Sequence, residues 1–337
     1  METFIIAEIG INHNGDLELA KKMIREAKKS GCNAVKFQTF KAEEFITDKS
    51  LTYTYNSQGK EITESQIDMF RRYEFEKEEW KSIFDYCDEV GIIGFTTPQN
   101  KSDLDFILDI VDLKYLKVGS DDLTNLPLLE YYASKNVPMI ISTGMSYEKE
   151  IEDAIMAVKK GGCGDLTVLH CISSYPAPIE DVNMKKMLTI KDKFDVKVGF
   201  SDHTTGYFSA VVSVSLGASI IEKHFTLSKD LPGPDHWFSA TPEEMKELVD
   251  NVRKAKTVLG NGSLVPTANE NEMRKICRRS IVARNNLSKG ALLCVEDLDF
   301  KRPGTGIPPN KMGDLIGKKL ISDIQTNQLI TMEHLEK

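Results

Sequence analysis

Two histidines, His203 and His224, each follow an apolar run in the second half of the sequence. If these runs are strands, alternate side chains share a face, so that Ser201 lies beside His203 and Glu222 beside His224. Two imidazoles from successive strand ends supply half of an open metal site, in which water and substrate oxygen fill the other positions. The alternative is a pair of core histidines with protein partners, but the shared position favours a divalent metal.

Two lysines, Lys36 and Lys117, stand inside apolar runs, although lysine is rarely buried unless it is paired. Gln38 shares the strand face of Lys36. Two ammonium groups that meet in one place predict a substrate with two or three negative charges. Hydroxyl groups that could donate to the same oxygens lie at or just beyond the expected strand ends. These residues are Thr97, Ser120, Ser142 and Ser201.

Two acidic residues are candidates for binding the uncharged part of a substrate. Glu8 lies inside an apolar run, where an unpaired carboxylate is costly. It forms either a structural ion pair inside the fold or hydrogen bonds to substrate hydroxyl groups. Asp235 and His236 follow the turn Pro232–Pro234, which either presents them over the site or is a simple connection.

The segments that would position these side chains alternate between short apolar runs and helical spacing. Eight such units in about 260 residues are typical of a TIM barrel, which carries its reactive groups at the carboxyl ends of the strands. An open doubly wound sheet is the rival, but no G-x-G-x-x-G motif follows the first run. The expected strands are Phe4–Ile9, Ala34–Gln38, Ile92–Thr96, Tyr115–Val118, Pro138–Ser142, Leu166–Cys171, Val196–Phe200 and Ser219–His224.

Two further regions lie outside this pattern. The long insertion at about 41–75 has no clear periodicity and is expected to form a structureless cover over the barrel mouth. After the Gly-rich segment near 260 the pattern changes to a small, mostly β domain. We therefore divide the chain into a catalytic barrel at 1–262, a linker at 263–278 and a small domain at 279–337. Its expected strands are Ser280–Ala283, Ala291–Cys294, Asp299–Lys301 and Gln328–Thr331.

Composition excludes several classes of protein. The 337 residues carry a formal net charge of −8 and no basic stripe, which argues against nucleic-acid binding. No apolar stretch is long enough for a transmembrane helix, and the first residues do not resemble a secretory signal. The six cysteines form no C-x-x-C pair and are expected to be reduced thiols of a cytoplasmic protein.

Taken together, the motifs resemble those of the sialic acid synthases, and the resemblance covers nearly the whole chain. The segment Lys301–Ile307 (KRPGTGI) is similar to the signature of that family's antifreeze-like domain, a SAF or β-clip fold. The barrel motifs that carry the resemblance are Ala7–Gly15 (AEIGINHNG), Ala34–Phe40 (AVKFQTF), Ile141–Met145 (ISTGM), Gly199–His203 (GFSDH), Ile221–Thr226 (IEKHFT) and Gly233–His236 (GPDH).

The resemblance implies that phosphoenolpyruvate (PEP) condenses with an N-acylated mannosamine-type sugar to give a nine-carbon 2-keto sugar acid and phosphate. It implies a Mn²⁺ or Mg²⁺ ion bound by His203 and His224, with Glu8, Glu222 and His224 as the reacting groups. It also implies a domain-swapped homodimer, in which Arg302 reaches the partner's site and contacts the N-acyl group. PEP would be held by Lys36, Thr97, Lys117, Ser120, Ser142 and Ser201. The sugar would be held by Glu8, Gln38, Tyr175 and Asp235.

One segment departs from the family pattern. Sialic acid synthases have Asn or Thr where Ile172 stands and Glu where Ser174 stands, so one expected polar contact is absent. Legionaminic acid synthases and spore-coat polysaccharide synthases of the same family are therefore candidates as well. Two other hypotheses remain: an aldolase that uses Lys36 or Lys117 as a Schiff base, and a non-catalytic binding protein suggested by the small domain alone.

Overall fold

The computed structural model describes residues 2–336, and the chain divides into two compact units, Met1–Gly260 and Asn261–Lys337. In the first unit eight parallel strands close into a barrel in the order β1-β10-β9-β8-β7-β6-β5-β2. This confirms the predicted TIM barrel and excludes the open sheet. The strands are β1 (Phe4–Gly10), β2 (Ala34–Thr39), β5 (Ile93–Pro98), β6 (Leu116–Val118), β7 (Met139–Ser142), β8 (Leu166–Cys171), β9 (Lys197–Asp202) and β10 (Ile220–His224).

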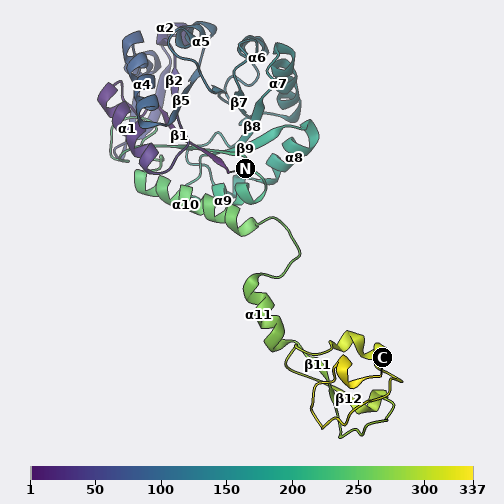
Figure 1. Cartoon of the computed structure of the whole chain (residues 1–337). Helices are drawn as coiled ribbons and strands as arrows, with labels where there is room; N and C mark the ends of the chain where they lie inside the picture. The colour runs from purple at the N-terminus through teal and green to yellow at the C-terminus, as the bar shows by residue number, and fades with distance from the viewer. Residues whose placement is uncertain (1, 337) are drawn as a thin grey trace. The chain divides into compact units, whose positions relative to one another are not determined.

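A helix follows each barrel strand, and Figure 1 shows these helices surrounding the strands of the first unit. A short 3-10 helix, η1 (Ile179–Asp181), lies between β8 and the helix that follows it. The surrounding helices are α1 (Leu17–Lys29), α4 (Lys77–Val90), α5 (Lys101–Leu108), α6 (Leu126–Ala133), α7 (Glu148–Gly161), α8 (Lys185–Phe194), α9 (Phe208–Ser215) and α10 (Pro242–Leu259).

Local sequence explains where these helices begin and which face they bury. Thr241 accepts a hydrogen bond from the amide of Glu244, whose carboxylate accepts one from the amide of Thr241, and Pro242 opens α10. Apolar residues at helical spacing on each helix then pack against the outside of the barrel. On α10 the buried residues are Met245, Leu248, Val249 and Val252.

The insertion between β2 and α4 is ordered, contrary to the expectation of a structureless cover. It contains an antiparallel hairpin of β3 (Thr52–Ser57) and β4 (Lys60–Ser65), flanked by α2 (Ala42–Phe45) and α3 (Gln66–Arg71). The hairpin is not evident from the sequence, because the side chains of both strands are mostly exposed or only partly buried and form no alternating apolar face. Small apolar clusters, such as Phe40 with Met69 and Tyr73, anchor the insertion to the barrel.

The second unit contains helix α11 (Ala268–Cys277) and an antiparallel pair of strands, β11 (Ser280–Ala283) and β12 (Leu298–Lys301). The expected strands at 291–294 and 328–331 are wrong. Each contributes only an isolated bridge, because the chain folds through tight turns and packs single side chains into a small core. Its 3-10 helices are η2 (Val295–Asp297), η3 (Pro309–Asp314) and η4 (Met332–His334). Within residues 2–336 no helix is both long and apolar enough to span a bilayer.

Candidate active site

A cavity of about 820 Å³ opens at the carboxyl ends of the barrel strands, and each of the eight strands contributes a polar side chain to it. TIM barrels carry their reactive groups at this end. Thirteen of the residues predicted from the sequence line this one cavity. They are Glu8, Lys36, Gln38, Thr97, Lys117, Ser120, Ser142, Tyr175, Ser201, His203, Glu222, His224 and Asp235.

Arg302 is the predicted site residue that does not belong to the barrel. It is exposed and directly follows β12 in the second unit. Its role at the site stays a prediction.

The floor of the cavity is a buried network of two lysines and two glutamates. The Nζ atom of Lys36 lies 3.0 Å from Glu8 Oε2 and 3.7 Å from Glu222 Oε2, and Lys117 Nζ lies 3.7 Å from Glu222 Oε1. No side chain of the four exceeds 6% exposure. Glu8 therefore does form the structural ion pair that was one of its two expected roles.

Each lysine of the floor also donates a hydrogen bond to a hydroxyl group. Lys36 donates to Thr97 Oγ1 at 2.9 Å, and Lys117 donates to Ser142 Oγ at 2.7 Å. Alternation along β2, β5, β6 and β7 places these four side chains on the inner face of the barrel. Together they form a region rich in donors, which suits an anion.

The two carboxylates have very different proton affinities. Burial raises the pKa of Glu8 to about 7, although Lys36 opposes this effect. Burial also acts on Glu222, but the ammonium groups of Lys117 and Lys36 outweigh it and lower the pKa of Glu222 to about 2. Without substrate, the site therefore contains one ionised carboxylate, Glu222, and one carboxyl group, Glu8, that exchanges a proton near neutral pH.

The two imidazoles lie side by side, with ring centroids 5.5 Å apart. His203 Nδ1 donates to the carbonyl oxygen of Ile172 at 2.7 Å, which leaves the lone pair on Nε2. His224 Nδ1 is buried and has no hydrogen-bond partner among residues 2–336. Burial lowers the pKa of both histidines, so both rings are neutral. Ser201 Oγ lies 3.3 Å from His203 Nε2, but its hydroxyl hydrogen is donated to Glu222, so the Nε2 lone pair stays available. Neutral imidazoles with an available lone pair are the form that binds metals.

No third protein ligand completes this pair: within the described chain, no group of three or more His, Cys, Asp or Glu side chains is arranged for a metal ion. The nearest carboxylate is Asp235, whose Oδ2 lies 3.8 Å from His224 Nδ1, and burial raises its pKa to about 6. The ring of Tyr175 packs 4.3 Å from that of His203, measured between centroids. Two histidines fit an open site in which exogenous ligands take the remaining positions.

Connecting segments supply the outer wall of the cavity, and apart from Tyr175 and Asp235 the sequence did not single out their residues. The β3–β4 hairpin contributes Tyr53 and Asn56, and the loop after β10 contributes Trp237 and Phe238. The insertion was recognised only as a cover, because its residues lack the strand-end position that identified the others. The wall is therefore aromatic and polar, whereas the floor is charged.

The loop that carries Asp235 is held from three directions. Thr226 Oγ1 and Asn14 Oδ1 lie 2.7 and 3.2 Å from the two ring nitrogens of His236. The amide of Gly233 donates to Ser57 Oγ of the hairpin at 3.1 Å. These contacts fix the place of Asp235 in the wall, as expected for a ligand-binding loop on a rigid scaffold.

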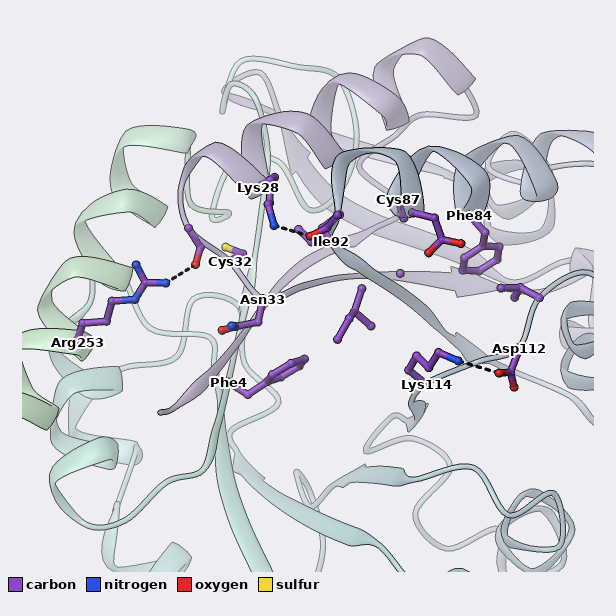
Figure 2. A pocket seen from close by; sticks show the side chains of 16 residues that line it. Phe4, Lys28, Cys32, Asn33, Phe84, Cys87, Ile92, Asp112, Lys114 and Arg253 are labelled. Carbon is purple, nitrogen blue, oxygen red and sulfur yellow. Dashed lines mark hydrogen bonds and ion pairs between the residues drawn. The ribbon is translucent and has the colours of Figure 1, made fainter. Parts of the chain in front are cut away.

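A second cavity, of about 660 Å³, lies at the amino end of the barrel and is drawn in Figure 2. Its basic groups already have partners. Arg253 donates to the carbonyl of Gly31 at 2.9 Å, Lys28 donates to a backbone carbonyl, and Lys114 Nζ lies 2.7 Å from Asp112 Oδ2. Because its cations are paired and this end of a TIM barrel contributes to stability, we do not assign a ligand to it.

Comparison with known proteins agrees with this geometry. Residues 23–264 match the model of the NeuB family, and residues 278–336 match that of the SAF domain. The chain is 43% identical to an N,N'-diacetyllegionaminic acid synthase of Legionella pneumophila, with 100% of this chain and 95% of that protein covered. It is 34% identical to the human N-acetylneuraminate-9-phosphate synthase, with 98% and 92% covered.

A solved structure supports the same assignment. The N-acetylneuraminic acid (sialic acid) synthetase of Leptospira borgpetersenii superimposes with a TM-score of 0.72 at 35% identity, over 81% of this chain and 90% of that one. The chain thus belongs to the NeuB family and carries a carboxyl-terminal SAF domain.

Proposed function

We propose that this protein condenses PEP with an N-acylated mannosamine-type sugar, giving a nine-carbon 2-keto sugar acid and phosphate. One observation carries the proposal: a donor-rich floor with Lys36 and Lys117 lies in the same cavity as the neutral pair His203 and His224. An anion and an aldehyde could therefore meet there. The relatives named as sialic and legionaminic acid synthases support this reaction class.

PEP would bind on the floor. Its phosphate and carboxylate would replace part of the contact of Lys36 and Lys117 with the glutamates, and Ser142 and Thr97 would donate to the same oxygens. In the reaction, C3 of PEP forms a bond with the aldehyde carbon of the open-chain sugar. Water adds at C2, and the bond between C2 and the phosphate oxygen breaks.

A divalent cation, Mn²⁺ or Mg²⁺, fits the two imidazoles, because both are neutral and His224 Nδ1 is a buried, unpartnered nitrogen within the described chain. Bound between His203 and His224, such an ion would supply Lewis acidity toward the aldehyde oxygen. Glu222 would take a proton from the attacking water: PEP would draw Lys36 and Lys117 away from it, and these ammonium groups are what lowers its pKa in the free protein. Glu8 would exchange protons near neutral pH.

For the sugar we propose an N,N'-diacetyl substrate that leads to a legionaminic-type product. The relative at 43% identity bears that name. The wall formed by Tyr53, Trp237 and Phe238 offers apolar surface to acetyl and deoxy-carbon methyl groups.

We further propose that the working form is a homodimer, in which Arg302 of each chain contacts the N-acyl group in the partner's site. The exposure of Arg302 leaves its guanidinium free for such a contact. We place the reaction in the cytoplasm, where the six free thiols would remain reduced.

The test is release of phosphate from PEP with a panel of N-acylated hexosamines, with and without EDTA. We expect turnover that EDTA abolishes and Mn²⁺ restores, and that His203→Ala and His224→Ala each reduce to background. Trapping of pyruvate on Lys36 or Lys117 by borohydride, without phosphate release from PEP, would instead support a Schiff-base aldolase. Near-normal activity in both histidine variants would exclude the metal site.

A further inference from the structure

A buried ion pair lies behind the two imidazoles. The Nζ atom of Lys223 is 3.1 Å from Asp202 Oδ2, and the two side chains are 4% and 0% exposed. Neither side chain lines the active-site cavity. Alternation along β9 and β10 directs them to the outer face of the barrel, whereas His203 and His224 line its mouth.

Both members of this ion pair form hydrogen bonds with Thr204, the residue that follows His203. Asp202 Oδ1 accepts hydrogen bonds from the amide of Thr204 at 2.9 Å and from its hydroxyl at 2.7 Å. The ammonium group of Lys223 donates to the carbonyl oxygen of the same Thr204. The backbone on both sides of His203 is thus held by the pair.

The ion pair also joins the two strands at their last register position. Lys223 lies opposite Asp202, and this is the final pair of the β9–β10 ladder. Lys223 directly precedes His224 in the sequence, just as Asp202 directly precedes His203. The pair therefore connects the two strands directly before His203 and His224, at the position where the register of β9 and β10 ends.

Stability alone is a weak explanation for such a pair. Removing two charges from water costs about as much as their attraction returns, and apolar pairs of similar volume are often equally stable. A buried pair does fix geometry, because both charges need each other and their hydrogen bonds.

We propose that Asp202 and Lys223 are positioning residues, which set the separation of the His203 and His224 rings and thereby the affinity of the divalent metal site. This inference rests on the metal-dependent function proposed above. Groups that orient metal ligands without touching the metal change its affinity by about 10- to 100-fold when they are replaced.

The test is the double variant Asp202→Leu/Lys223→Met, which removes both charges together and leaves neither buried alone. We expect Mn²⁺ to bind about 10- to 100-fold more weakly than to the unaltered protein. The thermal unfolding midpoint should fall as well, because the buried amide of Thr204 loses its acceptor, so the affinity is compared with that of a variant destabilised elsewhere. Binding is measured without substrate, from the electron paramagnetic resonance signal of free Mn²⁺ during titration.

Two controls separate the outcomes. Leu248 lies on the buried face of α10. Leu248→Ala opens a cavity there and should lower the unfolding midpoint without weakening Mn²⁺ binding. His203→Ala should abolish that binding. If the unaltered protein itself does not bind Mn²⁺, the proposed metal site fails, and this inference fails with it. If the double variant binds Mn²⁺ normally while His203→Ala does not, only the positioning role is refuted.

If the double variant does not fold, Asp202→Asn replaces it in the test. That change keeps the volume and the acceptor for the amide of Thr204, and it removes only the charge that faces Lys223. We expect Mn²⁺ affinity to fall several-fold. A folded Asp202→Asn protein with unchanged affinity would refute the proposal.

Discussion

At the scale of single residues, the site is a balance of charges. Lys36 and Lys117 are both bound to carboxylates before any substrate arrives. Sequence spacing correctly places both lysines at the cavity, because alternation along a strand decides which face a side chain takes. Their pairing with Glu222 was not predicted, because the three side chains stand on strands that are not neighbours in the barrel, and spacing does not show how far each one reaches across it.

Replacing Glu222 with Gln tests this balance. The amide keeps the volume and can still accept from Ser201, which donates to Glu222 Oε1 at 2.9 Å. Without the carboxylate we expect kcat to fall about 10²- to 10⁴-fold, because the proton acceptor is lost. The KM for PEP should stay equal or fall, because the lysines then have one competing anion fewer.

Steady-state kinetics with PEP as the varied substrate measures both parameters for Glu222→Gln, and circular dichroism checks that the variant is folded. Glu61→Gln, the same change at an exposed position of β4 outside the cavity, is the matched control and should leave kcat and the KM for PEP unchanged. A Glu222→Gln enzyme with a normal kcat would contradict the role of this residue as base.

At the scale of elements, strands and loops have different tasks. Strands carry the charged floor, and the predicted strand bounds agree with the observed ones to within two residues, as for β5, expected at 92–96 and observed at 93–98. Loops carry the wall, and there the sequence was less informative. Tyr53 and Asn56 reach the cavity only because the hairpin folds back over it, and no local pattern reports that contact.

The hairpin should therefore affect the binding of the sugar more than the binding of PEP. Its end is tied to the loop after β10: Gly233 donates to Ser57 Oγ, and Gln58 Nε2 donates to the carbonyl of Asp230 at 2.9 Å. In the variant Ser57→Ala/Gln58→Ala both ties are lost. Since each is worth about 1 kcal/mol, we expect the KM for the sugar to rise by up to about 30-fold and the KM for PEP to change less than about twofold.

Lys60→Ala, at an exposed position of the same hairpin, is the control and should leave both KM values unchanged. Hydrogen exchange of residues 52–65 should increase in the double variant only. An equal rise in the KM for the sugar and in the KM for PEP would show that the hairpin affects the binding of both substrates alike.

At the scale of the whole molecule, the barrel unit contains neutral histidines that the fold keeps from protonation. Burial, followed by the charge of His236, lowers the pKa of His13 to about 3, and the ring of His13 stacks on Phe75 at 4.4 Å. Burial likewise lowers the pKa of His236 to about 4.

Acid should therefore unfold the barrel progressively. The folded pKa of His13 lies below the value of about 6.5 in an unfolded chain, so its contribution is complete above pH 6.5 and is lost as the pH falls toward 3. We expect His13→Phe, which keeps a ring against Phe75, to reduce the slope of unfolding free energy against pH below 6.5 by about 1 kcal/mol per pH unit.

Urea unfolding at several pH values, followed by tryptophan fluorescence, measures this slope. Both tryptophans, Trp80 and Trp237, lie in the barrel unit, so the signal reports that unit alone. The free energy at pH 7.5 provides the reference for each protein. Equal slopes for the variant and the unaltered protein would mean that His13 is not protected from protonation.

The division between a floor on strands and a wall on connecting segments has an evolutionary consequence. Residues such as Tyr53 and Trp237 can be exchanged without disturbing the hydrogen-bonded ring of strands that carries Lys36 and Lys117. A lineage could thus change the acceptor it recognises by small steps while its anion-binding chemistry is inherited intact. A new acceptor specificity would then require changes in a few connecting segments, and the ancestral barrel would not need to be rebuilt.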